Sequence, residues 1–300
     1  MDAKQANTVY HDWEAPTYDE KWSISFDTRC IDYAAGRFRK VVPEVRTYDR
    51  ALEIGAGTGF FLLNLAQAGV ARELHVTDIS PGMVAVCERN GAQLGLAVHG
   101  RVADAESLPY DAAAFDLVVG HAVVHHLPDL EAAFAELRRV LVPGGRLVIA
   151  GEPTRAGDAI ANQFKRAARV GVKLAAVVAG SHRVLAPRNG RSSEDDAEAA
   201  ALEDVVDQHI FTPGELEEHA RAAGFCDVRT VTEELTASWF GWTTRTVEAM
   251  VGVDRLPAGY PWFAYRVWQW LFALDDAVAS RVVPKGIFYN CLLTATTPAS

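Results

Sequence analysis

The decapeptide LEIGAGTGFF, from Leu52 to Phe61, has the residue types and the spacing of a site that holds a polar cofactor. Gly55, Gly57 and Gly59 alternate between an apolar run and the apolar segment FFLLNLA. Glycine allows a sharp turn and lets a ligand approach the backbone closely. The unpaired N–H groups and the positive dipole end of a helix that follows such a turn attract polar groups. We therefore expect a nucleotide-like cofactor at this turn.

The same turn departs from the pattern of dinucleotide sites. These sites use G-x-G-x-x-G, and Phe60 stands where the third glycine would fall. Glu53 adds a negative charge just before the turn, which would repel a diphosphate and would suit an ammonium or a sulfonium group. The residues favour a positively charged cofactor over NAD, and a plain strand-to-helix turn is the alternative interpretation.

Composition limits the class of protein. The 300 residues are 49% hydrophobic, which is enough for a large core, and their formal net charge of −10 argues against a nucleic-acid-binding surface. The four cysteines are far apart, with no C-x-x-C pair and no histidine spacing suited to zinc, so we expect free thiols and no metal site. The N-terminus carries charges and lacks an apolar secretory core, and no apolar run approaches the length of a membrane span. These features predict a cytoplasmic protein.

Repeated strand-then-helix patterns position the turn within a larger core at residues 48–153. Such repeats predict parallel strands joined by right-handed crossovers. The expected strands are RALEIGA, ELHVTD, residues 98–103, FDLVVGH and GGRLVIAGE. Ligands bind such sheets at the carboxyl ends of the strands. Three polar residues fall there, each after a different strand: Asp78, Asp104 and His121. An acidic group at Asp78 is placed to reach ribose hydroxyls, and Asp104 to accept from an exocyclic amine.

The remaining residues predict additions to this core. Residues 1–47 precede the core. Residues 154–209 are expected to form a helical and loop insertion, and 210–300 the end of the core sheet with a Trp-rich helical insertion at 235–284. The first insertion is basic from Arg155 to Arg191 and acidic from Ser192 to Asp207. The second holds five of the seven tryptophans, and its segment PWFAYRVWQWLFALDDAV is apolar over most of its circumference. Such a helix requires a cover; it is either an ordinary buried helix or the wall of an apolar substrate pocket.

Five motifs together resemble the class I S-adenosylmethionine-dependent methyltransferases, most closely the ubiquinone/menaquinone-type group (methyltransferase type 11). They are LEIGAGTGFF, VTDISPGMV, VADAESLPY, FDLVVGHAVVHHLPD and LRRVLVPGGRLVIAGEP, in family order between Arg50 and Pro153. A weaker resemblance extends to FTPGELEEHARAAGFCDV and to the last strand. The resemblance implies an α/β fold: a Rossmann-like, doubly wound sheet of seven strands with the last one antiparallel.

The resemblance also implies roles for single residues. The turn residues would hold the methionine part of the cofactor, Glu53 would lie near its ammonium group, and the ends of strands two and three would hold ribose and adenine. The cofactor contacts implied in this way are Glu53, Gly55, Ala56, Gly57, Gly59, Asp78, Ile79, Met83, Asp104, Ala105 and His121. By the same resemblance, residues 1–47 would form an N-terminal cap or lid, with Tyr18 as the expected lid contact; the alternative is that the aromatic residues of this segment only pack it onto the core.

Methyl transfer from a sulfonium requires mainly in-line positioning, and a general base only if the acceptor is a hydroxyl or a carbon acid. The candidate catalytic residues are His125, His126 and Glu152. The histidines of HHLPD are alternatively part of the loop's structure, and Glu152, at the end of strand five, is expected to face the acceptor.

The sequence thus predicts methyl transfer to a small, hydrophobic acceptor such as a quinol, a polyketide, a lipid or a lipid-linked metabolite, with S-adenosylhomocysteine as the other product. The alternatives are a non-catalytic S-adenosylmethionine-binding protein, a methyltransferase acting on RNA, protein or another macromolecule, and an NAD oxidoreductase. Base-methylating relatives carry an Asn-Pro-Pro-aromatic motif after strand four, where this chain has GHAVVHH. The basic residues Lys165, Arg166, Arg169 and Lys173 suggest either a peripheral membrane contact or a solvated face.

Overall fold

The computed structural model describes residues 2–22, 24–44, 46–178, 209–252 and 255–299. The predicted acidic stretch from Ser192 to Asp207 lies outside the described residues, as do Arg183, Arg188 and Arg191 of the predicted basic segment. By their internal contacts the residues divide into two units, which we describe in turn. The first comprises Met1–Glu152, Ala201–Val231 and Leu292–Ser300, and the second Pro153–Ala200 and Thr232–Cys291.

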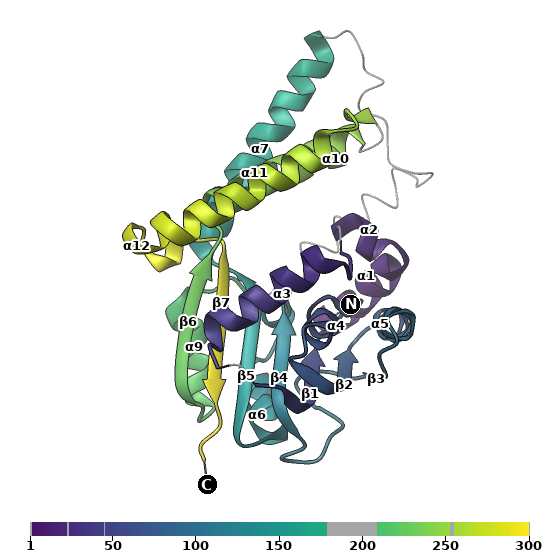
Figure 1. Cartoon of the computed structure of the whole chain (residues 1–300), viewed down its shortest axis with the longest axis vertical. Coiled ribbons are helices and arrows are strands. Elements are labelled where there is room, and N and C mark those ends of the chain that lie inside the picture. Colours follow the sequence, from purple (N-terminus) through teal and green to yellow (C-terminus); the bar gives the residue numbers. More distant parts are fainter. Residues whose placement is uncertain (1, 23, 45, 179–208, 253–254, 300) are drawn as a thin grey trace. The chain divides into compact units, whose positions relative to one another are not determined.

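A sheet of seven strands, in the order β3-β2-β1-β4-β5-β7-β6, is the framework of the fold. In Figure 1 the arrow of β7 points opposite to those of β4 and β6. Because β5 runs parallel to β4, the last strand is antiparallel to both of its neighbours, β5 and β6. The strands are β1 Tyr48–Ile54, β2 Ala71–Asp78, β3 Val98–Val102, β4 Phe115–His121, β5 Leu141–Pro153, β6 Cys226–Glu233 and β7 Asn290–Thr296. The predicted doubly wound sheet of seven strands is confirmed.

The central strands form because their residues are apolar on both faces, as parallel strands covered by helices require. In β4 five of the seven residues are buried, and β1 ends in four buried residues. Register then brings the strand ends together, since Ile54 of β1 pairs with Thr77 of β2 and with Gly120 of β4. The residues that follow these three strands therefore meet at one edge of the sheet.

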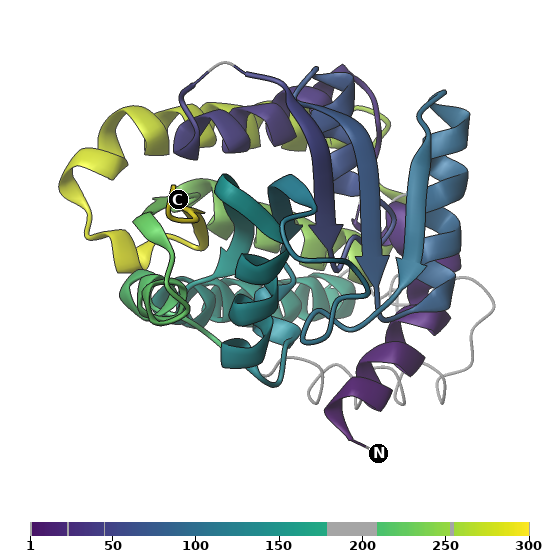
Figure 2. The ribbon, with the colours of Figure 1, turned by 90° about the horizontal axis from the view of Figure 1, so that it is seen from below.

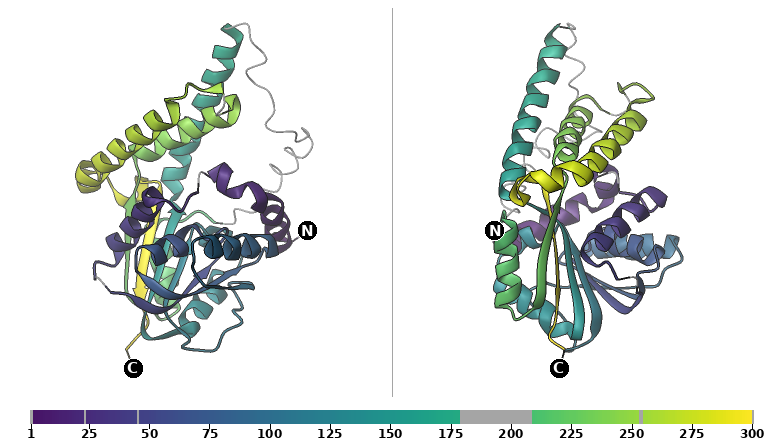
Figure 3. Two further views of the ribbon diagram at one scale, coloured as in Figure 1. Left: turned by 45° about the vertical axis from the view of Figure 1, so that its right-hand side comes forward. Right: turned by 60° about the vertical axis from the view of Figure 1, so that its left-hand side comes forward.

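Helices cover both faces of this sheet. In the right-hand view of Figure 3, α3, α4 and α5 lie on one side of the strands, and α6 and α9 on the other. Figure 2 shows β1, β2 and β3 side by side, with α5 running alongside β3. These helices are α3 Thr28–Val41, α4 Phe60–Gln67, α5 Pro81–Gln93, α6 Leu130–Val140 and α9 Pro213–Ala222. Ser80 and Thr212 cap α5 and α9, each with proline at the first helical position, as the sequence indicates.

The N-terminal segment of the first unit forms α1 (Ala3–Glu14), a short 3-10 turn and α2 (Tyr18–Trp22). Asp2 and Gln5 close the start of α1 with a capping box. Helix α1 packs on α5. The segment is therefore attached to the half of the sheet that carries β2 and β3.

The second unit is helical. Its longest helices are α7 (Arg155–Val178), α10 (Thr236–Val251) and α11 (Tyr260–Leu274), followed by the π-helical turn Asp275–Ala279, α12 (Ser280–Val282) and the 3-10 turn Lys285–Ile287. Helix α10 packs on both α7 and α11, and Figure 3 shows the three helices close together in both views. Aromatic rings contribute to this packing: Phe164 stacks on Trp239 at 5.2 Å between ring centroids.

A buried carboxylate fixes the start of α10. Asp275 is 2% exposed, and its Oδ2 accepts the N–H groups of Leu235 and Ala237, each at 2.9 Å. Its Oδ1 accepts the hydroxyl of Thr236 at 2.7 Å. A carboxylate at a helix N-terminus accepts hydrogen bonds from unpaired N–H groups, and its negative charge interacts favourably with the positive end of the helix dipole. The long insertion therefore has an ordered junction between α10 and the turn that follows α11.

Helix α11 differs from its prediction. The apolar sequence requires a cover, yet Ala264 is its only buried residue, and Trp262, Phe263 and Trp270 are 64%, 59% and 65% exposed. Among the described residues, no helix is long and apolar enough to cross a membrane. The aromatic surface of α11 thus lies on the outside of the helical unit.

Candidate functional site

The glycine-rich turn joins β1 to α4 with three glycines at positive φ: 53° at Gly55, 51° at Gly57 and 92° at Gly59. Two of the three sit against packed side chains. A Cβ atom at Gly55 would lie 2.1 Å from Cγ2 of Val123. At Gly57, by contrast, the one described atom within 4 Å of such a Cβ is Cε1 of Tyr18, at 3.9 Å. Gly57 is therefore the point at which the turn leaves room for a ligand.

Asp78, at the end of β2, is tied to this turn. Its Oδ2 accepts the N–H of Gly57 at 2.8 Å, and its Oδ1 accepts the N–H of Ser80 at 2.9 Å. Burial raises the pKa of Asp78 to about 6, against the opposing effect of these hydrogen bonds. A carboxylate has about four acceptor positions. Asp78 can therefore hold the turn and still accept from a ligand hydroxyl.

Glu53 lies below the turn and is 1% exposed. Its Oε2 accepts the N–H of Leu62, in the first turn of α4, at 3.0 Å. Burial, with a smaller contribution from the charge of Asp78, raises the pKa of Glu53 to about 8. A cation bound beside the turn would lower both raised pKa values, because it would stabilise the ionised forms of these two carboxyl groups.

The adenine-site candidate Asp104 is held by the N-terminal segment. Nζ of Lys4 lies 2.6 Å from Oδ2 of Asp104 and also pairs with Glu106. The N–H of Glu106 donates to Oδ1 of Asp104 at 2.9 Å, and Ala105 is buried beside them. Sequence reasoning missed Lys4, because a lone lysine near a terminus belongs to no motif.

The same segment reaches two further loops at the carboxyl edge of the sheet. Oδ1 of Asp12 accepts the N–H of Gly82 at 2.8 Å and is also bonded to the Ser80 hydroxyl. The rings of His11 and His126 lie 5.7 Å apart. Tyr18 packs on the cluster of Ala15, Met83 and Val86. The N-terminal segment thus contacts the loops that follow β2, β3 and β4, and Ile79 lies in the first of these loops.

His121 is enclosed by aromatic and charged groups. Its Nε2 lies 2.7 Å from Nη1 of Arg37, and its ring lies 5.1 Å and 5.3 Å from those of Phe60 and Phe61. Burial, together with the charge of Arg37, lowers the pKa of His121 to about 3. Because a guanidinium only donates, Nε2 must accept. His121 is therefore a neutral packing residue beside the turn, and Arg37 is a second residue that sequence reasoning missed.

Glu152 organises the loop after β4. It is fully buried, and Oε1 accepts the N–H groups of Val123 and Val124, each at 3.0 Å. Oε2 accepts the N–H of His125 at 3.1 Å and lies 2.8 Å from its Nδ1. Burial alone would raise the pKa of Glu152, but the His125 charge and these hydrogen bonds hold it below its usual value. The sequence predicted that Glu152 faces the acceptor; with both oxygens directed to the loop, it positions His125 instead.

The His125–Glu152 pair fixes one form of the imidazole. A carboxylate at Nδ1 keeps a proton there, so in the neutral form of the ring Nε2 is the nitrogen that carries the lone pair. This is the arrangement of a general base oriented by a carboxylate. His126 is half-buried, with its ring 3.9 Å from that of His125. The pair and the glycine turn are joined through Val123, which packs against Gly55 and donates its N–H to Glu152.

Comparison with known proteins agrees with this geometry. Residues 52–149 match the family model described as a methyltransferase domain. The aklanonic acid methyltransferase DauC of Streptomyces sp. (strain C5) is 33% identical over 156 residues, which cover 51% of this chain and 68% of the relative. The chain belongs to the S-adenosylmethionine-dependent methyltransferases.

Other methyltransferases match shorter parts of the chain. The demethylmenaquinone methyltransferase of Thermus thermophilus is 39% identical over 100 residues, or 33% of this chain and 46% of the relative. The chain thus spans about half the length of some curated relatives. Among solved structures, the [4+2]-cyclase SpnF has a TM-score of 0.58 at 20% identity, covering 100% of this chain and 98% of that one. This likeness shows the fold alone.

The residues fit the cofactor of this methyltransferase family. The open side of Gly57 provides space at the backbone, and Glu53 and Asp78 beside it are carboxyl groups whose ionised, negatively charged forms a bound cation would stabilise. S-adenosylmethionine carries an ammonium and a sulfonium group, so it matches that charge, whereas a dinucleotide diphosphate does not. The fit concerns the turn and the end of β2; for the adenine end, Asp104 and Ala105 stay predictions.

Proposed function

We propose that the protein transfers a methyl group from S-adenosylmethionine to a hydroxyl of a small, hydrophobic acceptor. The observation that carries the proposal is the link between the turn and the histidine. Val123 fills the space beside Gly55, and Glu152 holds both Val123 and His125. The proposed donor site, on the turn after β1, and the proposed general base, on the loop after β4, are thereby held together, which is what positioning catalysis requires.

In this proposal the N–H-rich turn at Gly57 binds the methionine part of the cofactor, Asp78 accepts the ribose hydroxyls, and Asp104 with Ala105 receives the adenine. Bound S-adenosylmethionine supplies a methyl group on a positively charged sulfonium. The neutral thioether that remains after the transfer is a good leaving group. Nε2 of His125 accepts the acceptor's hydroxyl proton, and Glu152 stabilises the imidazolium that results. Tyr18 and the N-terminal segment exclude water from the site.

The acceptor class rests on different support. The relatives are named for demethylmenaquinone and aklanonic acid, and the helical unit displays the exposed aromatic residues Trp262, Phe263 and Trp270. Exposed apolar surface of this kind is common at sites of interaction with apolar partners. We therefore propose a hydrophobic acceptor, and we propose that the helical unit makes peripheral contact with an anionic membrane through α7 and α11.

Titration calorimetry with S-adenosylmethionine and with NAD tests the cofactor part. We expect binding of S-adenosylmethionine only, weakened at least tenfold by Asp78→Ala, because a ligand hydroxyl loses its acceptor and the turn loses the bond to Gly57. Unchanged affinity in this variant, or binding of NAD, would contradict the cofactor assignment.

Transfer of labelled methyl groups to a panel of hydrophobic alcohols, quinols and phenols tests the reaction. With an accepted substrate, His125→Ala should lower kcat by about 10²- to 10⁴-fold, with little change in cofactor affinity. Glu152→Gln should lower kcat less and should change its pH profile. Cofactor binding without turnover across the panel would favour the non-catalytic alternative, and full activity of His125→Ala would remove the base from the proposal.

A further inference from the structure

A group of potential metal ligands lies on the sheet, away from the glycine turn. Glu73 and His75 are two residues apart on β2, so their side chains share one face of the strand. His99 of β3 is the register partner of His75 and extends the same row. One ligand atom from each of these three residues lies within 4.8 Å of the other two. Asp78, at the end of β2, is three residues further along the strand, roughly 10 Å away, so the group is separate from the cofactor site.

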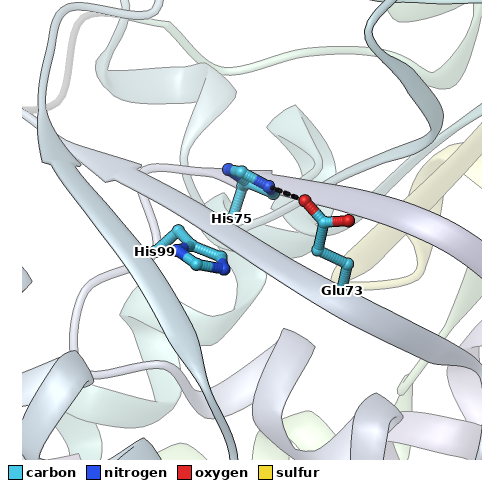
Figure 4. A group of neighbouring side chains, drawn as sticks. All are labelled: Glu73, His75 and His99. Atoms are coloured by element: carbon cyan, nitrogen blue, oxygen red, sulfur yellow. Dashed lines mark hydrogen bonds and ion pairs between the residues drawn. The ribbon is translucent and has the colours of Figure 1, made fainter.

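The ring of His75 is held firmly in place. His75 is 7% exposed, and its ring stacks on that of His99 at 4.8 Å between centroids. The edges of Tyr110 and Phe115 pack against it at 5.7 Å and 5.2 Å. In Figure 4 the ring of His75 lies over that of His99, and a dashed line joins His75 to the carboxylate of Glu73. A fixed ring beside two exposed, adjustable side chains is a partly preorganised ligand set.

The hydrogen bonds around Nε2 of His75 are mutually inconsistent. Oε1 of Glu73 lies 2.7 Å away, which as a hydrogen bond requires a proton on Nε2. Nη2 of Arg50 lies 3.3 Å from the same nitrogen, and a guanidinium only donates, so that contact requires a lone pair there. One nitrogen of a neutral ring cannot meet both demands. A cation between Nε2 and the carboxylate would satisfy both groups as acceptors.

The second ring nitrogen shows the same lack of balance. Nδ1 of His75 is buried and has no hydrogen-bond partner among the described residues. A structural histidine in a sheet normally has such a partner, and an orphaned buried polar atom costs about 1–3 kcal/mol. Hydrogen bonds among the described residues therefore leave this ring incompletely satisfied; because an ion on Nε2 would keep the proton on Nδ1, the argument for an ion depends on the contacts of Nε2.

We propose that Glu73, His75 and His99 bind a divalent transition-metal ion, with zinc as the best match. Two imidazoles and one carboxylate are ligands that zinc accepts, and a water completes the fourth position. Ligands at tetrahedral zinc, with bonds of about 2.0–2.2 Å, lie roughly 3.3 Å apart, so the exposed Glu73 carboxylate must move slightly away from Nε2 of His75, and the exposed His99 side chain must adjust to reach the ion. The ion would fasten the edge strand β3 to β2.

Arg50 competes with a metal ion for the carboxylate of Glu73 and so lowers the affinity of the site for the ion. Its Nε lies 2.9 Å from Oε1 of Glu73, so it supplies the positive charge at the site. Its guanidinium also donates to the carbonyl of Ala114 at 3.1 Å and lies over the ring of Phe115. Arg50 therefore keeps these two contacts when Glu73 binds an ion instead of the guanidinium. Removing the positive charge of Arg50 should strengthen ion binding.

Zinc titration of the tag-free, metal-stripped full chain tests the proposal, with a chromophoric chelator as competitor. We expect one zinc per chain. His99→Ala and Glu73→Gln should each weaken binding at least tenfold, and Arg50→Met, which keeps the apolar stem over Phe115, should tighten it at least fivefold. Both weakening substitutions change exposed side chains, and circular dichroism confirms that each variant is folded.

His126→Ala is the matched control, because His125 and His126 form a second close histidine pair, away from β2 and β3. It should leave zinc affinity unchanged. Loss of binding in His126→Ala, wild-type affinity in His99→Ala, or weaker binding in Arg50→Met would overturn the assignment. Absorption by Co²⁺ in place of zinc provides a second readout, since a tetrahedral spectrum should appear in the wild type and disappear in His99→Ala.

Discussion

The glycines of the turn differ in their surroundings. Substitutions at these positions can therefore distinguish an effect on stability from an effect on cofactor binding. In Gly57→Ala the added Cβ has open space around it, but the backbone has a positive φ, so the substitution should lower the unfolding free energy by about 1–2 kcal/mol. It should also weaken the binding of S-adenosylmethionine at least tenfold. Gly55→Ala adds a collision with Val123, so it should cost a further 1–3 kcal/mol or so. Urea unfolding and calorimetry measure both quantities.

Gly69 provides the matched control for this pair. It has a φ of 76° with nothing within 4 Å of an added Cβ, and it lies beyond the far end of α4. Gly69→Ala should therefore lose as much stability as Gly57→Ala and retain full cofactor affinity. Equal cofactor affinity in the two variants would remove Gly57 from the site.

The buried Glu53 predicts a pH dependence of stability. Its pKa is about 8 in the folded protein and about 4.3 in an unfolded chain. Between these values the folded state binds more protons than the unfolded state, so this residue makes the unfolding free energy fall as pH rises, by up to about 1.4 kcal/mol per unit. Glu53→Gln keeps an acceptor for Leu62 and lacks this titration.

Urea unfolding of the wild type and of Glu53→Gln at pH 5, 7 and 9 checks the sign. The variant should gain stability relative to the wild type as pH rises, with most of the gain between pH 5 and pH 8. Parallel curves for the two proteins would show that Glu53 titrates normally and that its burial has been misjudged.

At the scale of elements, the sequence predicted the position of the N-terminal segment but not the contacts that hold it. The family resemblance predicted a lid, while the contacts that attach the segment, through Lys4 and Asp12, belong to no motif and depend on the fold. The role of Tyr18 remains a prediction. Tyr18→Ala should raise the Kd for S-adenosylhomocysteine about tenfold, or ~1.4 kcal/mol, because its ring borders Gly57.

Calorimetry on a set of three variants separates this role from general packing. Trp13→Ala alters an aromatic residue of the same segment that is 36% exposed, and it should leave affinity unchanged. Tyr18→Phe keeps the ring and should also bind normally. Equal losses in Tyr18→Ala and Trp13→Ala would mean that the aromatic residues only attach the segment to the core.

The helices α7 and α11 carry the predicted membrane contact. Arg166, Arg169 and Lys173 are exposed on α7, and Trp262 and Trp270 are 64% and 65% exposed on α11. Basic residues near anionic lipid contribute about 1 kcal/mol each, and tryptophan favours the membrane interface. The protein should co-sediment with vesicles containing anionic phospholipid.

Salt and substitution distinguish this contact from adsorption. Binding should fall in 0.5 M salt, in vesicles of neutral lipid alone, and in the double variant Trp262→Ser, Trp270→Ser, which should stay folded because both positions are exposed. Exposed Val178 on α7 offers the matched apolar control as Val178→Ser. Indifference of the wild type to anionic vesicles would remove the membrane contact.

At the scale of the whole molecule, the parts that sequence predicted are those with local causes. The order of strands and helices in the core follows from alternating apolar patterns, and the antiparallel last strand from the family resemblance. The exposure of α11 could not be predicted, because apolar periodicity shows that a helix has a face to cover and not whether the fold covers it. Glu152 was placed correctly at its strand end, yet its direction depends on the loop that folds over it.

The Glu73, His75 and His99 group shows the same limit. The residues are separated by 2 and 24 positions, which resembles no metal-binding spacing, and only strand pairing brings them together. A search for polar residues in register on predicted neighbouring strands would have found them. Long-range register is therefore the information whose absence most limited the prediction of sites.

The division into two units also has an optical consequence. Trp239, Trp242, Trp262, Trp268 and Trp270 all belong to the helical unit, which leaves Trp13 and Trp22 in the unit with the glycine turn. Intrinsic fluorescence therefore reports mainly on the helices. The ring of Trp22 lies 6.2 Å from that of Tyr18. The difference in emission between the wild type and a Trp22→Phe variant therefore gives the small signal of a tryptophan in the unit with the glycine turn. One chain thus contains a strong reporter for one unit and a weak, separable reporter for the other.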